Sequence, residues 1–194
     1  MDNIYSIIGQ LPNELKSCFM AFDNVLLSNI TEIRLRINKP IIIYILDKPY
    51  FISKYDKLIN HYTDSVRYLS GEEFKFILDN ICNNSYHTHI NTMINGYVTD
   101  NYGSRVGIAG EAVYKDSALT SVKNIESINI RISHNIIDCS RNILNTLYLK
   151  SSPSIIIAGP PASGKTTILR DMTRLLSSGY AGKYRKISVI DEKN

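Results

Sequence analysis

The alternation of polar and apolar residues near the start of the chain predicts an antiparallel sheet. Residues 31–37 alternate with the two-residue period of a half-buried strand, and residues 41–46 are an apolar run typical of a more buried strand. Residues 50–53 have the pattern of a short third strand. Two turn sequences, Asn-Lys-Pro and Asp-Lys-Pro, separate the three strands. We therefore expect a meander with charged residues on its open face.

Helical spacing of apolar residues follows in two places. Residues 70–73, Ser-Gly-Glu-Glu, have the sequence of a capping box, in which the serine and the second glutamate bond each other's backbone amides at a helix start. The amphipathic helix that they begin ends at an Asn-Asn-Ser sequence. Residues 136–149 return to helical spacing and predict a second helix. Between the two helices, residues 105–114 and 128–132 predict further strands.

A different architecture follows a polar break at residues 150–153. A buried strand, a glycine-containing loop, an amphipathic helix and a second buried strand occur in the order of one βαβ unit, at residues 154–158, 159–164, 165–176 and 186–190. We place a domain boundary near residue 150. The predicted fold class is therefore α/β, with an N-terminal α+β domain over residues 1–150 and the start of a P-loop domain over residues 151–194.

The loop of this unit has the spacing of a phosphate-binding loop, Gly-x-x-x-x-Gly-Lys-Thr. Its glycines allow the backbone amides to point inward at phosphates, and the following helix adds the positive end of its dipole. The lysine supplies a charge for the β- and γ-phosphates, and the Thr166 hydroxyl is a ligand for Mg²⁺. The residues predicted to bind a nucleotide, ATP with Mg²⁺, are Gly159, Pro160, Pro161, Ala162, Ser163, Gly164, Lys165, Thr166 and Thr167.

The sequence identifies the residues for nucleotide binding more specifically than the residues for ATP hydrolysis. Asp191 and Glu192 end the second strand, and the carboxyl ends of parallel strands face the ligand crevice. Asp191 is therefore a candidate Mg²⁺ ligand and Glu192 a candidate catalytic residue near the attacking water. A simple turn at the end of the strand is the alternative. For the loop, the alternatives are a glycine turn and a degenerate loop that binds a nucleotide without hydrolysing it.

Composition narrows the class of protein. With 44% hydrophobic and 21% charged residues, the chain is typical of a globular protein. A net charge of +4 from scattered basic residues indicates a solvated surface, and we expect no nucleic-acid partner. Three widely spaced cysteines, Cys18, Cys82 and Cys139, indicate free thiols in a reducing compartment. No signal peptide and no membrane-spanning run are evident, so we expect a cytoplasmic protein, peripheral at the membrane only through partners.

Six motifs occur along the chain in the order of a known family. They are Glu-Ile-Arg-Leu-Arg at 32–36, Gly-Tyr-Val-Thr at 96–99, Gly-Ser-Arg-Val-Gly at 103–107, Asn-Ile-Arg-Ile at 129–132, the phosphate-binding loop followed by Thr-Ile-Leu-Arg-Asp at 167–171, and Val-Ile-Asp-Glu at 189–192. Together they resemble the stage III sporulation protein AA family of endospore-forming bacteria, over nearly the whole chain. This run of motifs is more specific than the loop alone.

The resemblance implies a secretion ATPase of the type II and type IV pilus class, with an N-terminal α/β domain joined to a RecA-like ATPase domain. It implies a homo-oligomer, a hexamer in the family, that powers a channel complex between mother cell and forespore and docks on its membrane proteins. Arg105 and Arg131 match recurring family arginines and are candidate phosphate or subunit-interface contacts; a surface ion pair is the alternative for each. Arg170 and Asp171 also match, although one helix face would explain them structurally.

The sequence departs from the family pattern after Glu192, where Lys193 and Asn194 stand in place of Arg-Ser-Glu. The family continues through later strands that carry further catalytic residues, so we expect a truncated or split product. The alternative function is then a catalytically incompetent nucleotide-binding or docking module. A small nucleotide kinase is disfavoured because a long segment precedes the loop. His87 and His89 have no evident third metal ligand, and we expect them in an exposed loop or strand pair.

Overall fold

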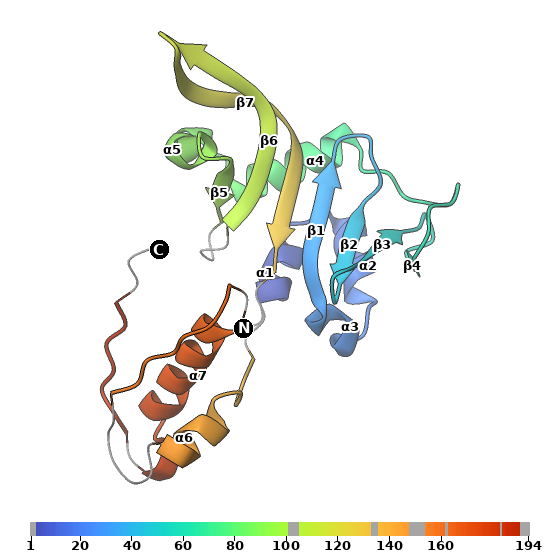
Figure 1. The fold of residues 1–194 in the computed structure, drawn as a ribbon. Helices are drawn as coiled ribbons and strands as arrows, with labels where there is room; N and C mark the ends of the chain where they lie inside the picture. The colour runs from blue at the N-terminus through green and yellow to red at the C-terminus, as the bar shows by residue number, and fades with distance from the viewer. Residues whose placement is uncertain are drawn as a thin grey trace. The chain divides into compact units, whose positions relative to one another are not determined.

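The computed structural model describes residues 3–100, 105–132, 136–147, 154–161, 163–182 and 184–190. The chain forms two compact units, Met1–His134 and Asn135–Asn194 (Figure 1). The division falls before the predicted boundary near residue 150, because the helix that precedes residue 150 packs within the second unit.

An antiparallel sheet forms the centre of the first unit. Its strand order is β4-β3-β2-β1-β7-β6-β5, and every pair of neighbours is antiparallel. The strands are β1 (Ile30–Arg36), β2 (Ile42–Ile45), β3 (Lys48–Ile52), β4 (Leu58–Ile59), β5 (Tyr97–Thr99), β6 (Arg105–Lys115) and β7 (Ala118–Arg131). The predicted meander is confirmed in β1, β2 and β3. Strand β7 begins at Ala118, well before the predicted residues 128–132. Its first part was not predicted because polar and apolar residues do not alternate there.

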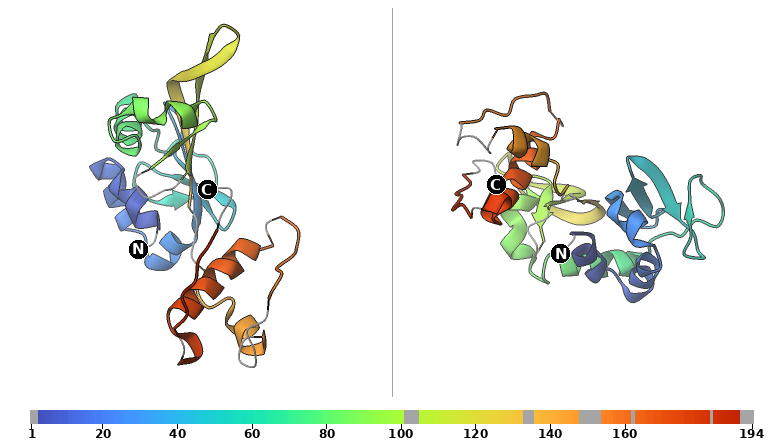
Figure 2. Two further views of the ribbon diagram at one scale, coloured as in Figure 1. Left: turned by 90° about the vertical axis from the view of Figure 1, so that its left-hand side faces the viewer. Right: turned by 90° about the horizontal axis from the view of Figure 1, so that it is seen from below.

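Helices cover one face of this sheet, as Figures 1 and 2 show. They are α1 (Asn3–Gly9), α2 (Asn13–Met20), α3 (Asn24–Ser28), α4 (Gly71–Ile81) and α5 (Ile90–Met93). Apolar side chains of these helices and of alternate strand residues form one buried cluster, which includes Phe19, Phe74, Ile33 and Ile130. The other face of the sheet carries the polar members of the same strands, so the charged open face that the alternation predicts is present.

The capping box at the start of α4 is confirmed. The Ser70 hydroxyl accepts a hydrogen bond from the Glu73 amide at 3.1 Å, and the Glu73 carboxylate accepts one from the Ser70 amide at 2.9 Å. After α4 the chain forms a short 3₁₀ helix, η1 (Tyr86–His89), so the expected loop or strand around His87 and His89 is wrong. No group of three or more potential metal ligands occurs among the described residues.

Strands β6 and β7 form a long hairpin that rises beyond its neighbours (Figure 1). Strand β1 pairs with β7 only at residues 127–131, and β5 pairs with β6 only at residues 105–107. The remainder of the hairpin is therefore a two-stranded ribbon. A shift of register between Ala109 and Glu111 places Gly110 where a β-carbon would lie 2.6 Å from the Lys123 carbonyl oxygen. A glycine is required there for lack of space.

The second unit contains α6 (Arg141–Leu147), α7 (Lys165–Ser177) and the short 3₁₀ helix η2 (Tyr180–Gly182). Leu144 of α6 and Met172, Leu175 and Leu176 of α7 form its buried cluster. The predicted helix over 165–176 is confirmed. The predicted helix over 136–149 begins only at Arg141, because the preceding backbone amides bond to a side chain of α7 instead.

The two strands predicted on either side of α7 are not formed in the described residues. Residues 154–158 and 184–190 are without assigned secondary structure, and neither pairs with a strand in the described part of the chain. Their apolar side chains are partly uncovered, with Ile156 94% and Ile190 90% exposed. A parallel strand is stabilised by neighbours along both edges and by layers on both faces, and the described residues of this unit supply none of these edges. Of the predicted βαβ unit, the described residues therefore form only the helix.

Candidate nucleotide-binding site

The predicted phosphate-binding loop lies directly before the longest helix of the second unit. Gly159, Pro160 and Pro161 are exposed, and the loop passes into α7 through Ser163 and Gly164. Ala162 lies outside the described residues. The loop thus ends at the amino end of a 13-residue helix, where backbone amides and the helix dipole favour an anion.

Gly164 is the residue that lets the chain enter this helix. It is the N-cap of α7 and has a left-handed conformation with φ of +84°. A side chain at this φ is strained for most residues, whereas glycine adopts it freely. The glycine also has no side chain that would itself bond to the amides of the first turn. The conformation and the missing side chain together leave the helix end open.

The first turn of α7 differs in this respect from those of α3 and α4. Asp23 caps α3 by accepting a hydrogen bond from the Leu26 amide at 2.7 Å, and Ser70 caps α4. By contrast, no side chain of the described residues caps α7 with a hydrogen bond, and its first turn contains no acidic residue. The first amides of a helix have no partner within the helix, so these amides are available to an external acceptor.

Lys165 extends back over the loop. Its ammonium group donates to the carbonyl oxygens of Gly159 at 2.9 Å and Pro160 at 2.6 Å. The Ser163 hydroxyl lies 3.5 Å away. These hydrogen bonds hold the positive charge of Lys165 beside the loop, and the loop leads into the uncapped amino end of α7. The arrangement suits a polyphosphate, which needs both amide donors and a cation.

Thr166 and Thr167 complete the first turn of α7. Thr166 is exposed, so its hydroxyl is accessible to a cation that a nucleotide brings. Mg²⁺ keeps several water and phosphate ligands and needs few ligands from the protein, so a single hydroxyl fits this ion. Asp191 and Glu192, the candidate Mg²⁺ ligand and catalytic residue, lie outside the described residues.

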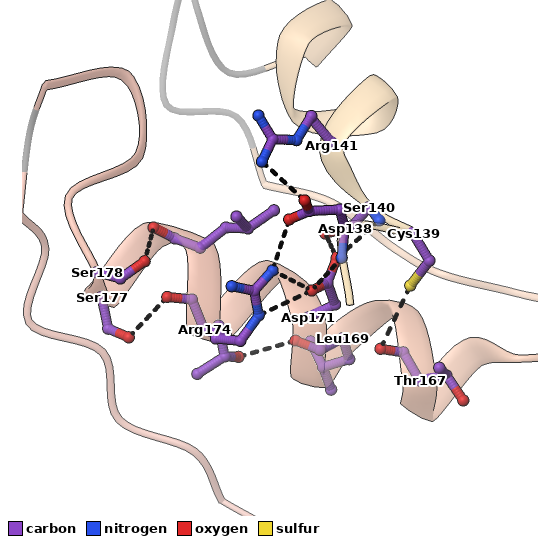
Figure 3. A network of polar contacts seen from close by, with 12 residues as sticks. Asp138, Cys139, Ser140, Arg141, Thr167, Leu169, Asp171, Arg174, Ser177 and Ser178 are labelled. Carbon is purple, nitrogen blue, oxygen red and sulfur yellow. Dashed lines mark hydrogen bonds and ion pairs between the residues drawn. The ribbon is translucent and has the colours of Figure 1, made fainter. Parts of the chain in front are cut away.

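A network of hydrogen bonds holds the middle of α7 to the residues before α6 (Figure 3). We call residues 136–140 the connector. The buried carboxylate of Asp171 accepts hydrogen bonds from the connector amides of Asp138 at 3.0 Å and Ser140 at 2.8 Å, and from the Ser140 hydroxyl at 2.7 Å. Its Oδ1, which accepts from the Asp138 amide, also accepts from the Arg174 guanidinium at 2.8 and 3.0 Å.

The connector residues of this network were not predicted from the sequence. Asp171 was a residue of the family resemblance with an expected structural role, but Asp138 and Ser140 were included in a predicted helix. The available signal was a short polar side chain, Ser140, immediately before a helical stretch, which is a common N-cap residue.

The network determines the charge state of Asp171. Burial by itself would disfavour the charged carboxylate, but the hydrogen bonds from Ser140, Arg174 and Asp138 outweigh it and lower the pKa of Asp171 well below its usual range. The hydrogen bond from Arg174 likewise lowers the pKa of Asp138. Both carboxylates are therefore charged near neutral pH.

The candidate arginines Arg105 and Arg131 lie in the first unit, on the open face of the sheet. Arg131 is opposite Glu32 in the β1–β7 pairing, and its guanidinium lies 3.8 Å from the Glu32 carboxylate. The β6–β7 register, continued by one residue, places Arg105 opposite Arg131. The guanidinium of Arg105 lies over the Tyr97 ring at 5.0 Å. The structure therefore brings the two arginines together on one face.

Two further arginines of that face were not singled out from the sequence. Arg34 and Arg36 on β1 line a groove of about 310 Å³ together with Gly107 on β6 and Asn129 on β7. Their alternation in the Glu-Ile-Arg-Leu-Arg motif was the available signal. Glu32 is ion-paired with Arg34 as well as with Arg131. The open face is thus a mainly cationic surface.

Comparison with known proteins matches the chain to one protein family. A family model described as sporulation stage III, protein AA matches residues 4–194. Stage III sporulation protein AA of Bacillus subtilis (strain 168) is 31% identical over 185 residues, which cover 95% of this chain and 56% of that protein. The chain therefore spans little more than half the length of this relative.

A solved structure is also similar to this chain. The ATPase DotB of Legionella pneumophila is matched with a TM-score of 0.38 and 17% identity, over 87% of this chain and 42% of that chain. Among the helices that the structure describes, none combines the length and the apolar character that a bilayer crossing requires.

Proposed function

The chain belongs to the sporulation stage III protein AA family, and from this premise we propose that residues 159–166 bind the phosphates of ATP together with Mg²⁺. The observation that carries the proposal is the uncapped amino end of α7 beside the Lys165 ammonium. A cationic side chain and a row of amides without a side-chain cap at the same loop are the two groups that polyphosphate recognition requires.

Four residues of the loop have distinct roles in this proposal. Gly159 and Gly164 let the backbone turn so that the amides of the loop and of the first helical turn face one ligand. Lys165 exchanges its carbonyl partners for phosphate oxygens, and Thr166 supplies a hydroxyl ligand to Mg²⁺. Bound Mg²⁺ neutralises part of the phosphate charge.

Replacement of Lys165 by alanine tests the proposal. Because a hydrogen bond to a charged group contributes about 1.5–3 kcal/mol, we expect Lys165→Ala to weaken binding of a fluorescent ATP analogue by about 10- to 100-fold. The measurement is fluorescence anisotropy in the presence of Mg²⁺. Lys16→Ala, at an exposed lysine of α2 in the first unit, is the matched control and should bind as the unmodified chain does.

Two results would contradict the loop assignment. One is equal affinity of the Lys165→Ala and unmodified chains, and the other is equal loss in the Lys16→Ala control. Phosphate release from ATP, measured on the same samples, separates a hydrolase from a binding module. Release that Lys165→Ala abolishes favours the hydrolase, and binding without release favours the catalytically incompetent docking module.

At the level of the whole protein, we extend the proposal to an ATPase that energises a channel complex between mother cell and forespore. The support for this step is the family membership together with the phosphate-binding loop. The proposal includes a homo-oligomer, hexameric in the family, that works in the cytoplasm and contacts membrane proteins of that complex. Arg105 and Arg131 are the proposed phosphate or subunit-interface contacts of the first unit.

A further inference from the structure

The buried carboxylate of Asp171 joins two segments of the chain, the connector and α7. Asp171 is 4% exposed, and its two carboxylate oxygens accept hydrogen bonds from both the connector and Arg174. A buried carboxylate that loses several of its donors is strongly disfavoured. Removing the connector would take away three of these donors at once. Docking of the connector is therefore expected to be all-or-none rather than gradual.

A second set of contacts makes the docking specific to one position on α7. The Asp138 carboxylate accepts from Arg174 at 2.8 Å and from Arg141 at 2.8 Å. Arg174 thus bonds both to Asp171 on its own helix and to Asp138 of the connector. The guanidinium of Arg141 also lies over the Tyr180 ring at 5.5 Å. These ion pairs bridge α6, the connector and α7 (Figure 3).

The connector also reaches the helical turn that follows the phosphate-binding loop. The Cys139 thiol donates to the Thr167 carbonyl oxygen at 3.9 Å, and Thr167 is in the first turn of α7. Asp171 is one turn further along the same helix. The connector therefore packs along the helical segment whose amino end presents Lys165 and the uncapped amides. In sequence it is also the stretch that leads from the sheet of the first unit to the second unit.

From this placement we propose that Asp171 is a positioning residue that couples the connector to the phosphate-binding loop. Docking of the connector orders the first two turns of α7, and a nucleotide bound at the amino end of α7 in turn favours the docked connector. Such coupling is reciprocal, because each event changes the free energy of the other by the same amount. The inference rests on the proposed function, since it requires a nucleotide at the loop.

The test compares the full chain with Asp171→Asn, which keeps the size of the side chain and removes its charge. The probe is a non-hydrolysable ATP analogue with Mg²⁺, and two quantities are measured. One is the affinity, and the other is hydrogen exchange of the amides of residues 136–147, followed by mass spectrometry. In the unmodified chain we expect the nucleotide to slow exchange of the connector. In Asp171→Asn we expect affinity to fall at least about fivefold and this slowing to disappear.

Two further variants separate positioning from loss of folding. Ser140→Ala removes only one hydroxyl donor to Asp171 and should give an intermediate fall in affinity with an unchanged circular dichroism spectrum. Asp64→Asn, at an exposed carboxylate of the first unit, should change neither quantity. A merely structural role would lower stability without altering the response of the connector to the nucleotide.

The failure of this inference can be told apart from that of the proposed function. If the unmodified chain binds no nucleotide, the proposed function and the coupling are both wrong. If it binds nucleotide and Asp171→Asn binds equally well, the coupling alone is overturned. The coupling alone is likewise overturned if the nucleotide binds to the unmodified chain but leaves its connector exchange unchanged.

Discussion

Two basic residues of β7, Arg131 and Lys123, have similar surroundings but different proposed roles. Arg131 and Lys123 are both exposed, and each lies near one carboxylate, at 3.8 Å from Glu32 and 3.5 Å from Glu111 respectively. Exposed ion pairs of this kind contribute little to stability, so the pairing does not explain why an arginine or a lysine stands at either position. The two residues differ in the proposal, because only Arg131 is assigned a phosphate or subunit-interface contact.

Arg131→Ala is therefore expected to weaken the binding of Mg²⁺-ATP about tenfold, whereas Lys123→Ala leaves it unchanged. The physical reason is the loss of a charge-assisted hydrogen bond to phosphate. The measurement is the same anisotropy titration, made at two salt concentrations because exposed charges are screened. Equal affinities for the two variants would exclude a phosphate contact of Arg131 and leave a subunit interface or a surface ion pair as its role.

At the scale of elements, the β6–β7 hairpin depends on a close approach of two backbones. Its distal part has no third strand among the described residues, so its ladder hydrogen bonds are those between β6 and β7, although β7 also contacts α5. Gly110 lies at the register shift, where a β-carbon would approach the carbonyl oxygens of Lys123 at 2.6 Å and Asn124 at 3.0 Å. Backbone atoms cannot move aside as the end of a flexible side chain can.

We expect Gly110→Ala to lower the free energy of unfolding of the first unit by about 1–3 kcal/mol, the usual cost of overpacking. Chemical denaturation followed by circular dichroism measures this change. Gly71→Ala is the matched control, since no atom lies within 4 Å of the β-carbon position there and its φ is not in the left-handed region. A change below about 0.5 kcal/mol in Gly110→Ala would show that the bulge adapts.

The elements also show which patterns were predictive. The helix α4 was predicted because a capping box and an apolar stripe are both local and agree with each other. The short helices α1, α2 and α3 were not predicted, because segments of 5–8 residues hold too few turns to establish a period. The start of α6 was predicted wrongly, because the amides of Asp138 and Ser140 bond to a residue that is distant in sequence.

At the scale of the whole molecule, the second unit is expected to be sensitive to acid. The pKa of Asp171 is lowered in the folded chain, and an unfolded aspartate titrates near about 3.9. The charged and titratable groups in contact with it are Arg174 on its own helix and Cys139 of the connector. The Asp138 carboxylate shares Arg174 with Asp171 and is also paired with Arg141 of α6. The pKa of Asp138 is lowered as well, so it acts in the same direction.

The stability that Asp171 contributes is therefore fully present above the unfolded pKa and is lost as pH falls toward the lower folded pKa. We expect the difference in unfolding free energy between the unmodified chain and Asp171→Asn to be constant near neutral pH and to shrink below about pH 4. Urea denaturation at stepped pH measures it. A difference that stays constant down to about pH 2.5, or that Asp64→Asn reproduces, would contradict this assignment.

The sequence by itself determined the features that depend on neighbours along the chain. These are the strand periodicity of the meander, the capping box of α4 and the spacing of residues 159–166, which also contributed to the family resemblance that the comparisons bear out. Each is expressed as a pattern within a few residues, so a short stretch of sequence is enough to recognise it. Nucleotide binding by the loop stays a prediction that the uncapped end of α7 now supports.

Only the tertiary structure decided the features that join distant segments. It placed Arg34 and Arg36 in one groove with residues of β6 and β7, and it brought the connector to Asp171 across 31 and 33 residues of sequence. It also showed that residues 154–158 and 186–190, whose composition is that of buried strands, join no sheet in the described part of the chain. The reason is physical: a buried carboxylate, a groove or a strand edge is completed by partners whose identity the local sequence does not contain.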